Sequence, residues 1–144
     1  MDVRKYLSRY HNMKIKLKKL EDLYEHYTLM SESIPSTQFD QVRVSGTRSL
    51  EAPFVKWLNK AMEVHYEIEQ IKKNLQNVKN EILSDICELD NPDYQRVLMY
   101  RYVDWLSWRE IADKMFYSSA SIRRMHDKSI EEIALIINGK DEQA

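Results

Sequence analysis

The feature that most constrains this chain is an apolar seam with alternating spacings of three and four residues. Residues with this average spacing line one side of an α-helix and are buried when a second helix packs there. A half-buried strand would need apolar residues at every second position. The seam therefore predicts a long coiled-coil helix. Its members are Phe54, Trp57, Ala61, Val64, Ile68, Ile71, Leu75, Val78, Ile82, a polar Asp85 and Leu89.

A second seam precedes this one and indicates another helix that reaches about Met30. Two helices of similar length with a return connection predict an antiparallel hairpin, although pairing between subunits is the alternative. Because a two-helix unit buries little apolar surface, we expect a homodimer or a higher homo-oligomer in either case. The members of this first seam are Tyr6, Tyr10, Met13, Leu17, Leu20, Tyr24 and Tyr27.

Residues 31–53 carry no seam and contain Pro35, Gly46 and Pro53, which predicts an irregular connector. Arg43 and Arg48 flank the glycine. A plain connector is the simpler interpretation, and an arm that contacts DNA or a polymerase is the alternative.

The last third of the chain predicts shorter helices. Pro92 ends the long helix and begins another that reaches about Val103, with Val97, Leu98, Arg101 and Tyr102 as packing residues. Residues 107–133 then have the spacing of two helices joined by a tight turn. Ser107 and Glu110 form a capping box, and Ser118 caps the second helix. We expect Phe116 and Tyr117 to fill the turn. The residues predicted to face a shared core are Trp108, Ile111, Ala112, Met115, Ile122, Met125, Ser129, Ile130 and Ile133.

This pattern predicts a helix-turn-helix whose second helix presents small polar residues and arginines, as a major-groove reader does. Arg124 suits a guanine edge, Arg123 a phosphate or base, and Ala120 a thymine methyl group. The candidate DNA-binding residues are Ser118, Ser119, Ala120, Ser121, Arg123, Arg124 and Lys128. The helix is expected to end at a cap formed by Asn138 and Gly139. The predicted organisation is therefore a coiled-coil region at 1–90, a helix-turn-helix domain at 91–138 and a tail at 139–144.

The charge distribution permits local basic faces although the formal net charge is −1. Val3–Leu20 contains seven Lys or Arg residues and no acidic residue. Its lysines are interpreted as a solvated face of the coiled coil, with a phosphate-contacting face as the alternative. Because Arg96–Lys128 contains four Asp or Glu residues beside its seven Lys or Arg residues, affinity from phosphate neutralisation should be modest.

Other functional classes are not indicated. The single Cys87 has no disulfide partner and is expected to be a small core or interface residue. His11, His26 and His65 lack a second ligand at metal spacing, so we expect no metal and no cofactor. Glycine-rich phosphate loops, paired carboxylates and nucleophile constellations are missing, which disfavours an enzyme. Without an apolar run of about 18 residues or a signal-peptide pattern, a soluble, intracellular protein with no membrane partner is expected.

The segment RVLMYRYVDWLSWREIADKMFYSSASIRRMHDKSIEEI resembles region 4 of the bacterial sigma-70 family, and more closely the small phage proteins of the ArpU/RinA type. The resemblance covers roughly the last third of the chain. Trp105 and Phe116 occupy positions where the family usually has glycine, so each must adopt left-handed geometry at some cost, or the turn must be rebuilt. The matching residues are Leu98, Arg101, Tyr102, Leu106, Ser107, Trp108, Glu110, Ile111, Ala112, Ser118, Ile122, Arg124, His126 and Ile130.

The resemblance implies an all-α protein with a coiled-coil hairpin followed by a sigma-region-4-like helix-turn-helix. It implies a phage late-gene activator that binds double-stranded DNA as a dimer or higher oligomer. One alternative is a module that engages host RNA polymerase or another host protein without specific DNA binding. A second alternative is a DNA-packaging recognition subunit, in which the DNA-binding part usually comes first.

Overall fold

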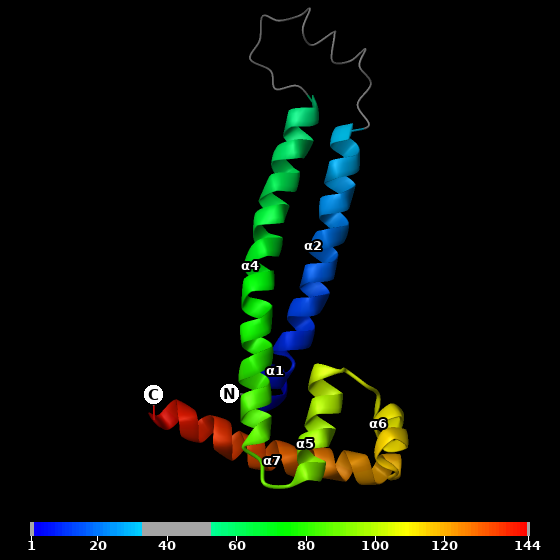
Figure 1. Ribbon diagram of the computed structural model, residues 1–144, viewed down its shortest axis with the longest axis vertical. Coiled ribbons are helices and arrows are strands. Elements are labelled where there is room, and N and C mark those ends of the chain that lie inside the picture. The colour runs from blue at the N-terminus through cyan, green and yellow to red at the C-terminus, as the bar shows by residue number, and fades with distance from the viewer. Residues whose placement is uncertain (1, 33–52, 144) are drawn as a thin grey trace, which may run out of the picture. The chain divides into compact units, whose positions relative to one another are not determined.

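The computed structural model describes residues 2–32 and 53–143, and these are helical apart from short turns (Figure 1). No β-strand occurs in these ranges, so the predicted all-α class is confirmed. Residues 33–52, with Arg43 and Arg48 of the predicted connector, lie outside the described part. The elements are α1 (Val3–Leu7), α2 (Arg9–Glu32), α4 (Pro53–Cys87), α5 (Pro92–Leu98), the π-helix η1 (Met99–Val103), α6 (Trp108–Met115) and α7 (Ser119–Gln143).

The chain divides into two compact units. Unit 1 comprises Met1–Lys14 and Asn74–Ala144, and unit 2 comprises Ile15–Lys73. This division differs from the predicted boundary near residue 90, because the first residues and the last turns of α4 pack against the C-terminal helices.

Unit 2 is built from the later part of α2 and the earlier part of α4. Tyr24 contacts His65 and Tyr27 contacts Trp57, with ring centroids 5.6 Å and 5.9 Å apart. Residues that advance along α2 thus meet residues that recede along α4, so the helices run antiparallel. The α4 seam is buried as predicted at Ala61, Val64 and Ile68, whereas α2 has no fully buried residue. The first seam therefore forms only a half-buried face.

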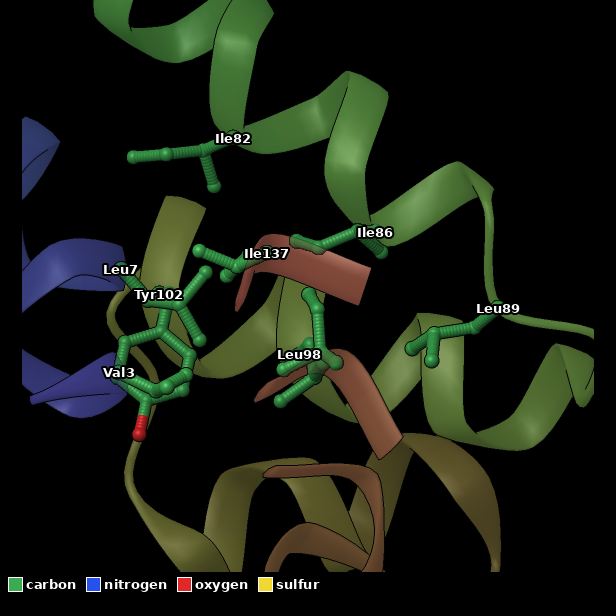
Figure 2. Packing of buried hydrophobic residues seen from close by; sticks show 9 residues of the cluster. Val3, Leu7, Ile82, Ile86, Leu89, Leu98, Tyr102 and Ile137 are labelled. Carbon is green, nitrogen blue, oxygen red and sulfur yellow. The ribbon is translucent and has the colours of Figure 1, made fainter. Parts of the chain in front are cut away.

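Unit 1 holds a core to which α1, α4, α5, η1 and α7 all contribute (Figure 2). Tyr102 of η1 enters it, as expected of a packing residue. The last turns of α4, which the sequence assigned to the coiled coil, enter it as well. The α1 segment is a separate short helix because Ser8 interrupts the predicted continuous one. The buried members of this core are Val3, Leu7, Ile82, Ile86, Leu89, Leu98, Tyr102, Ile133 and Ile137.

The prediction that the last helix ends at Asn138 and Gly139 is wrong. The α7 helix continues to Gln143, through the residues assigned to a tail. Lys140 lies 2.6 Å from a carboxylate oxygen of Asp85 and 3.0 Å from one of Glu88. These ion pairs stabilise the helix beyond the glycine. Cys87 is exposed in the chain, so the core position expected for it is wrong, whereas the interface position remains a prediction.

Candidate nucleic-acid interface

The α6 helix begins and packs as the sequence predicted. Ser107 Oγ accepts a hydrogen bond of 3.2 Å from the backbone N–H of Glu110, which is one half of the predicted capping box. The apolar face of α6 forms a second core in unit 1, which holds this helix against α5 and α7. The buried members of that core are Val97, Ile111, Ala112, Met115 and Ile122.

The turn after α6 is formed by Phe116 in left-handed geometry, with φ 60° and ψ 39°. The backbone N–H of Tyr117 donates to the carbonyl of Ala112 at 3.1 Å and closes the helix end. Trp105 is also left-handed, with φ 56°. Trp105 and Phe116 are thus both left-handed and accept the cost of a side chain in that geometry.

The prediction that Phe116 fills the turn is wrong, because its side chain is 92% exposed. A left-handed residue after a helix points its side chain away from the helix, and the backbone alone closes this cap. Tyr117 is partly exposed, and its hydroxyl donates to a carboxylate oxygen of Asp93 at 3.1 Å. That hydrogen bond raises the pKa of Tyr117.

The N-terminus of α7 is capped as predicted, and the cap occupies two candidate DNA-binding hydroxyls. Ser118 Oγ accepts from the N–H of Ser121 at 3.1 Å and donates to Ser121 Oγ at 2.9 Å. Arg124 also donates to Ser121 Oγ, at 3.5 Å. The outward surface is therefore provided chiefly by Ala120, Lys128 and the two arginines, which are exposed. The Ser119 side chain is half-buried.

The adjacent arginines Arg123 and Arg124 line different depressions of unit 1. Successive residues of an α-helix differ by about 100° around its axis, which separates their side chains. Arg124 and Lys128 border a depression of about 330 Å³ beside the start of α5. Arg123 borders a larger one of about 510 Å³ together with Arg4 of α1 and Arg101 of η1. The structure thus brings Arg124 and Lys128 together and directs Arg123 elsewhere.

Sequence reasoning missed the second group of basic residues. Arg101 was predicted as a packing residue and as part of the sigma-like resemblance, and Arg4 belongs to the far end of the chain. His126, predicted only as part of the sigma-like resemblance, is buried and borders the same depression as Arg4, Arg101 and Arg123. Its burial lowers its pKa. Arg101 could have been noticed in the sequence, because it is a basic residue within the sigma-like segment. The position of Arg4 beside it depends on tertiary packing alone and could not have been predicted.

Within residues 2–32 and 53–143, no group of three or more His, Cys, Asp or Glu residues is placed to hold a metal ion. In residues 2–32 and 53–143, no helix combines the length and apolar character needed to cross a bilayer.

Comparison with known families gives one result. Residues 29–134 match the family model described as "Protein of unknown function (DUF1492)", so the match covers more than half of the chain and includes α6 and the first turns of α7. No curated protein and no solved structure matched the chain.

Proposed function

The chain belongs to the DUF1492 family, and we propose that it is a DNA-binding transcription regulator that acts through α6 and α7. The observation that supports this proposal most is the exposed, basic first part of α7 after a capped α6 and a tight turn. A helix presented in this way has the dimensions of a major-groove reader. The resemblance to phage ArpU/RinA-type proteins favours late-gene activation in a bacterial host.

Base readout falls mainly on Arg124 and Ala120 in this proposal. Ser118 and Ser121 bond each other, so their hydroxyls have less capacity for base edges than the sequence indicated. A bidentate contact from Arg124 to guanine would contribute about 1–3 kcal/mol of discrimination at one base pair. Lys128 borders the same depression as Arg124, and Arg123 borders a separate one. In this proposal both residues contact phosphates.

Self-association would strengthen DNA binding, because each chain presents only a few base-contacting residues. Leu58, Met62 and Tyr66 follow one another at four-residue intervals on α4 and are 44%, 63% and 66% exposed. A second copy of the same stripe is the occupant we propose, because an isologous contact needs only a self-complementary surface. A dimer would favour paired half-sites about 34 Å apart or at a multiple of that spacing.

Fluorescence anisotropy with a labelled duplex from a phage late promoter region tests the proposal. We expect salt-sensitive binding that Arg123→Ala/Arg124→Ala weakens at least tenfold, while Lys73→Ala on unit 2 leaves it nearly unchanged. An absence of wild-type binding at low salt would contradict the proposal.

A protein-binding role is the second candidate, and the exposure of Phe116 is the observation that favours it. A large aromatic side chain that contacts almost nothing in its own chain is typical of an interface anchor. Pull-down of host RNA polymerase tests this role. Loss of capture with Phe116→Ala, and its retention with Arg123→Ala/Arg124→Ala, would separate protein binding from DNA binding.

A further inference from the structure

Three arginines from three elements of unit 1 border one depression of about 510 Å³. Arg4 comes from α1, Arg101 from η1 and Arg123 from α7. The one carboxylate in the lining is that of Asp127. His126 also borders the depression, but burial lowers its pKa, so it adds no charge near neutral pH. The lining therefore carries an excess of positive charge in a chain whose overall charge is close to zero.

The guanidinium of Arg101 is fixed by uncharged groups. Its Nη1 donates to the carbonyl of Leu106 at 2.9 Å, and its carbon lies 4.2 Å from the ring centroid of Trp108. No ion pair of Arg101 or Arg123 occurs within the described ranges. Aromatic and carbonyl partners orient an arginine without neutralising it, which leaves its charge available to an anion.

Arg4 is held differently, by an ion pair that is easily exchanged. Its Nη2 lies 3.3 Å from Asp127 Oδ1, and the two side chains are 60% and 64% exposed. Ion pairs in such surroundings contribute little because solvent screens them. An arriving phosphate could therefore replace Asp127 as the partner of Arg4 at small cost.

We propose that Arg4, Arg101 and Arg123 seat a phosphate of the DNA backbone, and that this phosphate displaces Asp127 from Arg4. The proposal rests on the proposed function, since it extends the DNA contact from α7 across η1 to α1. Arg123 belongs to both surfaces. The N-terminal helix thus becomes part of the DNA-binding unit, although the sequence assigns it to the coiled coil.

The salt dependence of binding to a 20-base-pair duplex tests this contact. Each phosphate contact adds about 0.9 to the slope of log K against log salt. Because Arg101 and Arg123 still face the phosphate, we expect Arg4→Gln to reduce the slope measurably and by at most that amount. The affinity of the variant should then fall by up to about threefold less than that of the wild type between 50 and 200 mM salt. Lys73→Gln, with the same change of charge on unit 2, should keep the wild-type slope.

Asp127→Asn gives a change of the opposite sign. It removes the competing carboxylate, so we expect tighter binding than the wild type with an undiminished slope. A purely structural role for the ion pair predicts weaker binding for both variants, and that result would overturn the proposal. Thermal unfolding of each variant checks that the fold is retained.

A free phosphate ion offers the same chemistry as the DNA backbone, and inorganic phosphate is the probe that separates them. The indole N–H signals of Trp105 and Trp108 report on the depression. If wild-type protein binds DNA but Arg4→Gln keeps the wild-type slope, the proposal is overturned, and indole shifts with inorganic phosphate would then assign the seat to a free anion. If wild-type protein binds no DNA, the proposed function itself fails.

Discussion

The hydroxyl of Tyr102 lies 2.7 Å from Nε2 of His126 in the interior of unit 1. The Asp127 carboxylate lies 3.3 Å from Nδ1 and can only accept a hydrogen bond, which assigns the ring proton to Nδ1. Nε2 then accepts from the Tyr102 hydroxyl. Burial lowers the pKa of His126 and outweighs the hydrogen bond to Asp127, while Arg4 and Arg101 lower it further. The folded protein therefore holds this histidine in its neutral form.

Stability should consequently fall as the pH falls below about 6.5. An unfolded histidine has a pKa near 6.5, so between that value and the lower folded pKa the unfolded chain binds more protons. Urea unfolding at pH 7.5 and 5.5 measures the effect, and His126→Gln should reduce the loss. Burial also lowers the pKa of His11, so His11→Gln should reduce the loss in the same direction. An equal pH dependence in wild type and His126→Gln would contradict the assignment.

Asp85 is a buried carboxylate that replaces an apolar residue in the α4 seam. Tyr6 donates to it at 2.6 Å and Lys140 at 2.6 Å. Burial raises the pKa of Tyr6, which keeps the hydroxyl protonated as a donor. We expect Asp85→Ala to lower the free energy of unfolding by about 1–3 kcal/mol in urea titration, because two donors lose a charged acceptor.

The length of α7 allows a matched test of the same contact. A chain that stops after Asn138 loses Lys140, whereas a chain that stops after Lys140 keeps it. We expect the shorter chain to melt at a lower temperature and the longer one to stay close to the full chain. Equal melting temperatures would show that the contact adds nothing to stability.

The two left-handed aromatic residues should respond to glycine in opposite ways. Phe116→Gly removes backbone strain and little packing, so we expect the free energy of unfolding to rise by about 0.5–1 kcal/mol. Phe116→Ala keeps the strain and serves as the control. Trp105→Gly should destabilise, because its ring stacks on His11 with centroids 3.7 Å apart. Chemical denaturation measures all three, and destabilisation by Phe116→Gly would contradict this account.

Self-association through α4 can be tested by measuring the molar mass of the protein in solution. Met62→Lys places a charge in the middle of the exposed Leu58–Tyr66 stripe, so we expect the molar mass from light scattering to fall toward that of one chain. Lys73→Ala, outside the stripe, should leave the mass unchanged. A wild-type protein that is already monomeric at high concentration would exclude this interface.

The sequence predicted the elements better than their contacts. The α4 seam and the caps at Ser107 and Ser118 depend on neighbouring residues, and local spacing was sufficient for them. The left-handed geometry of Trp105 and Phe116 was expected only from the sigma-like resemblance. The extension of α7 past Gly139 depends on Asp85, which lies on another helix. Tertiary packing overrode the local helix-stop signal there.

In the candidate site, too, local features were predicted from the sequence and features that depend on tertiary packing were not. Exposure of Arg123 and Arg124 followed from the period of one helix. Their separation into two depressions, and the place of Arg4 beside Arg123, depend on how α1, η1 and α7 pack. The full exposure of Phe116 was missed because the pattern indicated a bulky residue at the turn but not the direction of its side chain.

Mapping of amide chemical shifts on addition of a late-promoter duplex tests the central claim most directly. We expect the largest changes at residues 118–124 at the start of α7, with smaller ones at Arg4 and Arg101 and almost none on unit 2. Changes confined to the lysines of α2, or no change at low salt, would contradict the claim that α7 binds DNA.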